Sequence, residues 1–298
     1  MELEVSLFLM EEKLIQYSIK YLKILVITNS IKMDNEDINN YKLKLKTEQA
    51  GAFRILVEAL KEILTESNFT FDESGIKLMA MDSTHTILIH MKLEADNFEF
   101  FHCDKKVIIG VNMLNFFKLI KTMGNSETLT LFVDNENENK LGIMINNSEK
   151  NSQTIYKLNL LDIPDANISI PPAEFETELS LPSGDFQKII RDMINIGENI
   201  EIKSIGSQLI LNCCGDFASQ ETILGETNNG LKFNQTSPEE LPIQGLFSLK
   251  YLSLFTKCTN LCNQINLYIK NDYPLIIKYA VASLGNIKLC LAPNTGVN

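Results

Sequence analysis

Residues 118–133 read KLIKTMGNSETLTLFV, and residues 254–269 read LFTKCTNLCNQINLYI. Aligned without a gap, the two segments place Lys121 over Lys257 and one alternating strand pattern over another. The repetition extends upstream, where Gly51-Ala52-Phe53 and Gly184-Asp185-Phe186 each open a helical pattern. Because self-similarity of this kind indicates duplication, we expect two copies of one unit, each with two helices and a set of strands.

Short segments with a two-residue period make up most of the chain after residue 41. Turn sequences such as DESG at 72–75, GNSE at 124–127 and NDYP at 271–274 separate them. The pattern predicts half-buried antiparallel strands. The clearest ones contain Ile76, Leu78 and Ala80; Leu129, Leu131 and Val133; Ile265, Leu267 and Ile269; Leu275, Ile277 and Tyr279; and Ile287, Leu289 and Leu291.

Four segments instead carry an apolar stripe with helical spacing, and each is about three turns long. The third has a start signal, because Ser183 could cap free backbone amides and Asp185 suits the positive end of the helix dipole. Few helices among many strands predict the α+β class. The stripes are Phe53, Leu56, Val57, Leu60, Ile63 and Leu64; Met113, Phe117, Ile120 and Met123; Phe186, Ile189, Ile190 and Met193; and Leu252, Phe255 and Thr259.

These elements divide the chain into four parts. We expect an N-terminal extension at 1–41, a first domain at 42–160, a connector at 161–175 and a second domain at 176–298. The connector contains three prolines and no regular period, which favours an ordered linker. The extension has neither an apolar run of membrane-spanning length nor a recognisable targeting pattern. It is either an appended tail or a segment rarely translated because Met33 is the working start codon.

Composition places the chain among ordinary globular proteins. It is 45% hydrophobic and 22% charged, which excludes disordered, collagen-like and disulfide-scaffold proteins. Six cysteines without a CxxC pair favour reduced thiols in an intracellular protein. The three histidines share no metal-ligand spacing with them, so we expect no metal site and no cofactor. The net charge of −11 argues against a protein that coats nucleic acid by bulk attraction.

Positive charge is nevertheless concentrated in the four predicted helices. They hold eight basic residues and four acids (Glu58, Glu62, Asp185 and Asp192), a balance of +4 against −11 for the whole chain, so the remainder carries −15. For any single helix, a solvated face or ordinary i,i+4 pairs such as Arg54 with Glu58 and Lys188 with Asp192 would explain this. Recurrence in all four helices favours a common surface for a polyanion such as duplex DNA, contacted through phosphates. The basic residues are Arg54, Lys61, Lys118, Lys121, Lys188, Arg191, Lys250 and Lys257.

Several separated motifs occur in an order and spacing that resemble a known family. They are VEALKEIL (57–64), GIKLMAMDSTH (75–85), LPSGDFQKIIRDMINIGE (181–198), SLKYLSLFTKCT (248–259), YPLIIKY (273–279) and LAP (291–293). The chain resembles the eukaryotic and archaeal DNA sliding clamps, proliferating cell nuclear antigen, from about residue 42 to 293. Residues 1–41 have no counterpart there.

The resemblance implies a non-enzymatic processivity factor: a ring of three identical subunits, with helices lining a central hole and sheets forming the outer wall. Edge strands would join across the interface, here 154–160 of one subunit and 217–224 of its neighbour. The implied partners are double-stranded DNA, DNA polymerase, a clamp loader and other replication and repair proteins, with no membrane. The implied location is the nucleus, or a cytoplasmic replication site if the chain is viral.

The resemblance also assigns residues to two surfaces. The eight basic helix residues would face DNA, and flexible lysines suit weak, mobile phosphate contacts. A second surface would bind a short partner peptide with a glutamine and paired aromatics. Phe175 and Cys290 depart from the tyrosines that are commoner there. The matching positions are Met81, His85, Leu88, Ile168, Ile170, Phe175, Pro274, Cys290, Leu291 and Ala292.

Two other functions compete with this interpretation. One is a hydrolase that uses Asp82, Ser83 and His85, although a catalytic triad within four consecutive positions is rare because its members normally come from separate elements. The other is a subunit of a heterotrimeric checkpoint-type clamp, which would share the fold but assemble only with other chains.

Overall fold

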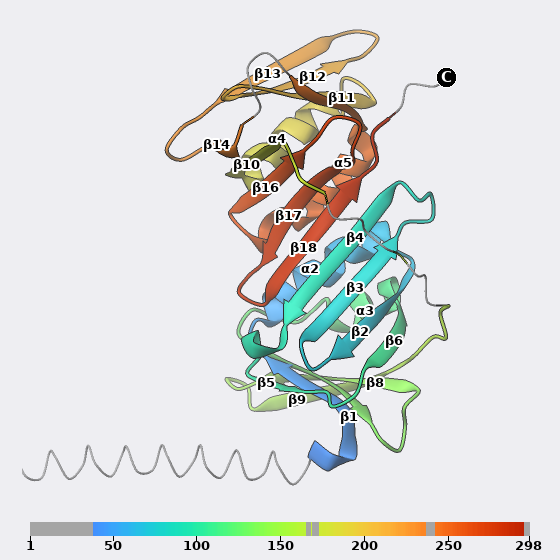
Figure 1. The fold of residues 1–298 in the computed structure, drawn as a ribbon. Helices are drawn as coiled ribbons and strands as arrows, with labels where there is room; N and C mark the ends of the chain where they lie inside the picture. Colours follow the sequence, from blue (N-terminus) through green and yellow to red (C-terminus); the bar gives the residue numbers. More distant parts are fainter. Residues whose placement is uncertain (1–37, 165–167, 169–172, 237–241, 295–298) are drawn as a thin grey trace, which may run out of the picture.

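The computed structural model describes residues 38–164, 168, 173–236 and 242–294 (Figure 1). Its strands form three antiparallel sheets. The first has the order β5-β1-β7-β8-β9. Its strands are β1 (Tyr41–Thr47), β5 (Phe100–His102), β7 (Thr128–Asp134), β8 (Lys140–Asn147) and β9 (Ser152–Asn159).

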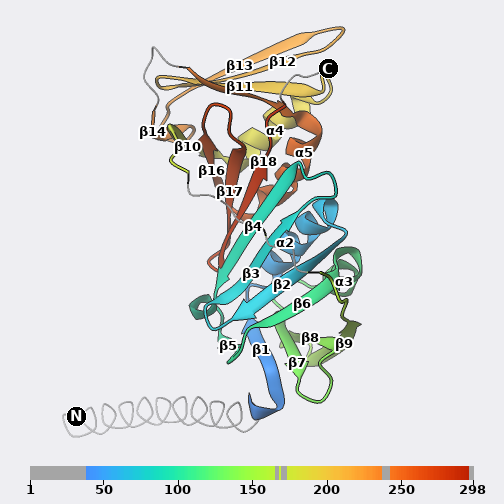
Figure 2. The ribbon, with the colours of Figure 1, turned by 45° about the vertical axis from the view of Figure 1, so that its right-hand side comes forward.

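The second sheet has nine strands in the order β14-β10-β16-β17-β18-β4-β3-β2-β6 and runs through the middle of the molecule (Figures 1 and 2). It consists of β2 (Glu66–Asp72), β3 (Gly75–Met81), β4 (Ile87–Glu94), β6 (Val107–Asn112), β10 (Thr177–Pro182), β14 (Lys232–Gln235), β16 (Gln264–Ile269), β17 (Leu275–Val281) and β18 (Gly285–Leu291). The third sheet, β13-β12-β11-β15, contains β11 (Asn199–Ile205), β12 (Gln208–Cys214), β13 (Ser219–Gly225) and β15 (Ile243–Ser248).

The strand orders confirm the predicted duplication. The series β5-β1-β7-β8-β9 recurs as β14-β10-β16-β17-β18, and the series β6-β2-β3-β4 recurs as β15-β11-β12-β13. The two copies merge where β18 of the second pairs with β4 of the first, from Gly285 opposite Leu93 to Leu291 opposite Ile87. Alternate residues of this pair are buried in the core, as the two-residue period predicts. The fold is therefore α+β, as expected.

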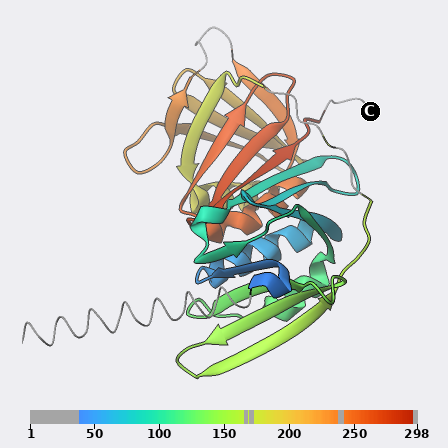
Figure 3. The same cartoon turned by 60° about the horizontal axis from the view of Figure 1, so that its bottom comes forward.

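Four α-helices in the described part of the chain cover one face of the nine-stranded sheet: α2 (Ala50–Ile63), α3 (Met113–Ile120), α4 (Ser183–Met193) and α5 (Leu249–Phe255). Three short 3-10 helices accompany them, η1 (Ile38–Asn40), η2 (Ala95–Asn97) and η3 (Thr256–Leu261). Helix α2 contacts α3 within its own half, and α5 and η3 across the junction. The helices of both halves thus form one layer, visible beneath the central sheet in Figure 3.

Three details of the helices differ from the sequence expectation. Phe116, rather than Phe117, fills the core position of α3, where its ring packs against Phe53 at 6.3 Å between centroids. The hydroxyl of Ser183 does not cap α4; it donates to the carbonyl oxygens of Thr259 and Cys262, at 3.2 and 2.6 Å. Helices α3 and α5 are also shorter than three turns, with 8 and 7 residues.

The edge strands of the three sheets differ in their length and in whether another segment covers them. Leu161 donates its backbone N–H to the carbonyl of Gly110 on β6, and Asn294 donates to Leu246 on the corresponding strand β15. The edges β5 and β14 are only 3 and 4 residues long. Within the described residues, β9 and β13 remain as long edge strands without a neighbour. Such edges are ready to pair with another chain.

We predict that Gly110→Ala destabilises the fold by about 1–3 kcal/mol, because its methyl group would lie 2.3 Å from the carbonyl oxygen of Leu161. The contacting atom belongs to the backbone and cannot rotate away. Gly184→Ala is the matched control: no atom lies within 4 Å of its methyl group, and it replaces a helical glycine. It should change stability little or raise it by up to about 1 kcal/mol. Urea unfolding of both variants would measure the difference, and equal midpoints would contradict the steric argument.

Candidate nucleic-acid interface and docking surface

The helix layer brings together the eight basic residues predicted from the sequence. Arg54 and Lys61 lie on α2, whereas Lys188 and Arg191 lie on α4. Lys118 lies in the last turn of α3 and Lys121 is its C-cap residue. Lys250 lies on α5, but Lys257 belongs to the following 3-10 helix, η3. Contacts of α2 with both α5 and η3 join the two halves of this surface.

Six of the eight side chains are exposed and form no ion pair with any described residue: Lys118, Lys121, Lys188, Arg191, Lys250 and Lys257. Lys250 lies near the ring of Tyr251, at 5.7 Å from its centroid. The Lys188–Asp192 pair considered from the sequence is thus not formed. Exposed lysines and arginines without local carboxylates can contact phosphates at little desolvation cost.

Arg54 and Lys61 are engaged within the chain. Arg54 Nη1 lies 3.7 Å from Glu58 Oε2, the i,i+4 pair considered from the sequence, and the Arg54 side chain is only 24% exposed. Lys61 pairs with the neighbouring Glu62 and lies over the ring of Phe117, 4.8 Å from its centroid. These two cations would have to give up intrachain partners before they contacted DNA. The sequence could not separate them from the other six, because the separation depends on side-chain packing.

A second surface lies on the opposite face of the central sheet. The registers place Met81 opposite Leu88, Leu88 opposite Cys290, and Cys290 opposite Ile276. Because directly opposite residues point to the same face, these four side chains form one apolar row across β3, β4, β18 and β17. Met81 is 42% exposed, and Leu88 and Ile276 are half-buried. We call these four residues the apolar row.

The other predicted pocket residues have varied positions. Phe175 packs against Tyr268 and Tyr273, with ring centroids 5.5 and 5.6 Å apart, beside half-buried Pro274. Leu291 points into the core and is fully buried, so only its main chain could contact a peptide. The N–H of Ala292 already donates to Thr86 O at 3.0 Å. Ile168 is half-buried, and Ile170 lies outside the described residues.

Ile276 and Tyr268 were missed by the sequence analysis. Ile276 completes the apolar row, and Tyr268 lies opposite it on β16. The alternation in LIIKY did contain a signal, because Leu275, Ile277 and Tyr279 were assigned to the core and Ile276 must then face outward. Its place beside Cys290 depends on the strand register, which no local pattern provides.

The loop between β3 and β4 is organised by the carboxylate of Asp82. This carboxylate accepts hydrogen bonds from the backbone N–H groups of Thr84, Thr86 and Ile87 and from the Thr84 hydroxyl. Burial raises the pKa of Asp82, but these hydrogen bonds outweigh it and hold the pKa below the ordinary aspartate value. Because the Asp82 carboxylate accepts four hydrogen bonds from this loop, its role is to stabilise the conformation of the loop.

The same loop gives no support to the hydrolase interpretation. Among the described contacts, Asp82 reaches His85 only through the backbone, where His85 N–H donates to Asp82 O. His85 itself is exposed, with a positive φ of 56°. A nucleophile, base and orienting acid must be linked by side-chain hydrogen bonds, and Asp82, Ser83 and His85 show none among themselves.

The described residues contain no group of three or more histidine, cysteine, aspartate or glutamate side chains that could hold a metal ion. None of their helices is both long and apolar enough to span a bilayer.

Comparisons with known proteins cover both halves of the chain. Residues 42–167 match the family model of the proliferating cell nuclear antigen N-terminal domain, and residues 169–294 match that of its C-terminal domain. A relative from Paramecium bursaria Chlorella virus 1, named probable DNA polymerase sliding clamp 1, is 34% identical over 261 residues, which cover 86% of this chain and 98% of the relative. Proliferating cell nuclear antigen of Chaetomium thermophilum is 30% identical over 256 residues, covering 85% and 98%.

The duplicated fold, the joined layer of helices and these matches lead to one conclusion: the chain belongs to the proliferating cell nuclear antigen family of DNA sliding clamps, the processivity factors of DNA polymerases.

Proposed function

We propose that this chain closes into a homotrimeric ring around duplex DNA, with the helix layer inside and the central sheet outside. The observation that carries the proposal is the pair of open edge strands, β9 and β13. By the duplication, β9 corresponds to β18 and β13 corresponds to β4. The junction that β18 and β4 form within one chain can therefore be repeated between chains. A head-to-tail contact of this kind forms a ring when its rotation closes.

Exposed apolar side chains support this assignment of the interface. Ile155 on β9 is 48% exposed, and Ile223 on β13 is 54% exposed. On the inner side of the two strands, Tyr156, Leu158 and Leu224 pack only partly against the core. Pairing β9 with β13 of a neighbour would complete that burial and also satisfy the free backbone groups of both edges.

The duplication also supports one particular register for the proposed contact. Transferring the β18–β4 register through the corresponding strands pairs Ser152 with Leu224, Thr154 with Thr222, Tyr156 with Gln220, and Leu158 with Ala218. All eight are even-numbered, and the half-buried members among them face the core. On the outer side, Ile155 lies opposite Glu221, with Ile223 as a diagonal neighbour. The register therefore matches inward positions with inward positions.

The exposed cations on the helices support the placement of DNA in the hole. All six exposed cations lack an ion pair with any described residue, while the rest of the chain carries most of the negative charge. A ring stays on DNA because it encircles the duplex, so it needs only weak, sequence-independent contacts. Lysines suit such contacts because they can exchange one phosphate for the next. The acidic remainder disfavours DNA outside the ring. In this role the chain performs no catalytic step and needs no cofactor.

The apolar row and its surroundings fit the docking of partner peptides. The aromatic side chains of such a peptide would cover Met81, Leu88 and Ile276, and the carbonyl of Ala292 would accept from the glutamine amide. Polymerase, clamp loader and other replication and repair proteins would bind here. The location would be the nucleus, or a cytoplasmic replication site if the chain is viral. The proposed clamp domains are 42–160 and 176–298, and 161–175 is the connector between them.

Light scattering should give a mass near three times 33.7 kDa for the full chain. Ile155→Glu should reduce the mass towards one subunit, because the new carboxylate would lie opposite Glu221 of the neighbour. Adding Glu221→Lys should restore the trimer by placing opposite charges across the contact. Ile108→Glu, at the 44% exposed Ile108 of β6, is the matched control and should remain trimeric.

Two results would contradict this assignment. An unmodified chain that stays monomeric at micromolar concentration and assembles only with other chains would indicate a checkpoint-type heterotrimer. A trimer that survives Ile155→Glu unchanged would place the interface elsewhere.

Lys118→Ala with Lys121→Ala should leave the trimer intact and lower polymerase processivity on long primed templates several-fold, because both lysines are exposed and unpaired in the described structure. Arg54→Ala with Lys61→Ala should have a smaller effect on processivity, since Glu58 and Glu62 already neutralise these cations. Lys105→Ala with Lys106→Ala removes the same charge from an exposed loop outside the helix layer and serves as the control. Unchanged processivity of the first variant would refute the assignment of the DNA-facing side.

A further inference from the structure

Two lysines and a histidine lie directly beside the apolar row. His90 on β4 is opposite Lys288 on β18, and Lys288 is opposite Lys278 on β17. They face outward, because the residues that alternate with them, such as Ile277 and Leu289, are fully buried. Each is two positions along its strand from Leu88, Cys290 or Ile276, a distance of about 7 Å. We call these three residues the cationic row.

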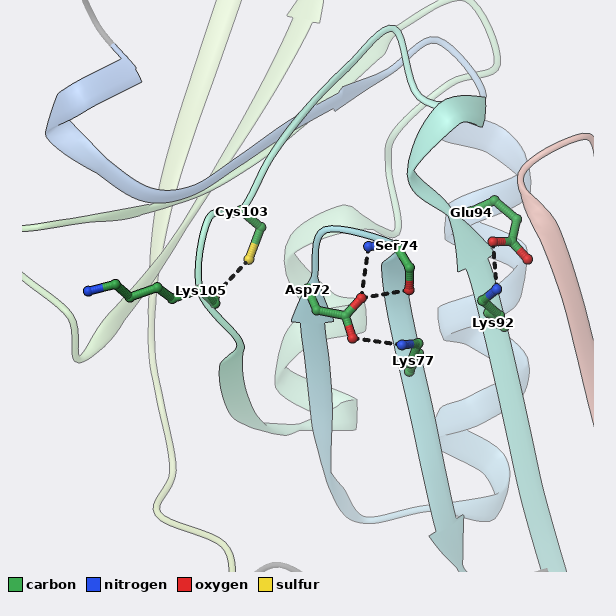
Figure 4. Close-up of polar contacts among 7 residues, drawn as sticks. All are labelled: Asp72, Ser74, Lys77, Lys92, Glu94, Cys103 and Lys105. Carbon is green, nitrogen blue, oxygen red and sulfur yellow. Dashed lines mark hydrogen bonds and ion pairs between the residues drawn. The ribbon is translucent and has the colours of Figure 1, made fainter.

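The charge of the cationic row is not balanced within the described chain. Lys278 and Lys288 form no ion pair with any described residue. Nearby lysines on the same sheet behave differently: Lys92 pairs with Glu94 at 2.8 Å and Lys77 with Asp72 at 2.6 Å (Figure 4). Local carboxylates thus neutralise the lysines of β3 and β4 but not those of β17 and β18. In a chain of net charge −11, this is a local reversal of sign.

His90 reflects the same accumulation of positive charge. Burial lowers the pKa of its imidazole, and the charges of Lys288 and Lys92 lower it further. The residues that flank the row on the adjacent strands are not acidic: Asn266 lies opposite Lys278, and Met79 lies opposite His90. Lys278 and Lys288, directly opposite one another without a carboxylate, repel one another, and an incoming anion would relieve the repulsion.

We infer that the cationic row is a specificity subsite, which favours docking peptides that carry aspartate or glutamate next to their apolar anchor. The inference rests on the peptide docking proposed above and adds a chemical class of partner to it. An extended peptide whose anchor covers the apolar row reaches the cationic row about two residues later, since its own rise per residue matches that of the strands. The half-buried lysines would bind its carboxylates more strongly than fully exposed ones could.

A polypeptide fits this surface better than a nucleic-acid strand does. The row has only two lysines and a histidine, and its long side borders the apolar side chains of Leu88, Cys290 and Ile276. A phosphate backbone would require further cations along its path, whereas an acidic peptide with an apolar anchor matches both rows at once.

Two fluorescent peptides test the inference on the assembled full chain. Both contain the glutamine and paired aromatics, and the residues on each side of that anchor are glutamate in one peptide and glutamine in the other. Fluorescence anisotropy at low salt should show the acidic peptide binding roughly fivefold tighter, with the advantage shrinking as salt is added. Lys278→Gln with Lys288→Gln should abolish that advantage and leave the Kd of the neutral peptide nearly unchanged.

Lys77→Gln with Lys92→Gln is the matched control, because it removes the same charge from the same face at lysines that already have carboxylate partners. This variant should retain most of the preference. Equal affinity for the two peptides, or an advantage that survives Lys278→Gln with Lys288→Gln, would overturn the inference while leaving docking intact. Binding of neither peptide would overturn docking itself. Displacement of the acidic peptide by a DNA oligonucleotide would instead make the row a nucleic-acid contact.

Discussion

The antiparallel pairing of β4 with β18 is the interaction on which the rest of the structure depends. It joins two copies of one unit into a nine-stranded sheet and brings α2 against α5 and η3 on the inner face. The same register aligns Leu88 with Cys290 and His90 with Lys288 on the outer face. A slip by one residue would turn every side chain of one strand to the other face, so both candidate surfaces depend on this register. Two hydrogen bonds between Gln49 and Ser283 also connect the two halves of the chain.

Burial and charge on the helices follow from the same arrangement. The apolar stripes of α2 and α4 are buried by the sheets, so their polar sides form a single surface. Where a carboxylate lies on the same helix, as Glu58 does beside Arg54, part of the positive charge is already neutralised. Helices α3 and α5 carry lysines and no acid, which leaves their charge available to an external anion. The potential of this surface therefore depends on where acids are absent as much as on where lysines are present.

The sequence predicted the fold class, the duplication and the strands, because alternation and repetition are local patterns that the tertiary structure preserved. It failed where packing decides between neighbours. Phe116 and Phe117 both fit a helical stripe, and only contact with Phe53 and Phe69 selects Phe116 for the core. Ser183 fits an N-cap by sequence, yet the nearby end of η3 offers carbonyl acceptors for its hydroxyl. The family resemblance supplied Met81, Leu88 and Cys290, but Ile276 and the cationic row were missed, because their places depend on a register across β4, β17 and β18 that only the folded sheet defines.

The two faces of the central sheet carry the two proposed binding surfaces, and their chemistries are independent. A β-strand sends alternate side chains to opposite faces, so residues such as Ile89 and Leu289 support the helix layer while His90 and Lys288 remain outside. In the proposed ring, changes in the outer rows would therefore alter partner choice without disturbing the core that positions the helix cations. A ring that slides on DNA must bind the duplex weakly but hold its partners selectively. Strand alternation supplies this separation, because the selective contacts use one set of residues and the core beneath the mobile contacts uses the other.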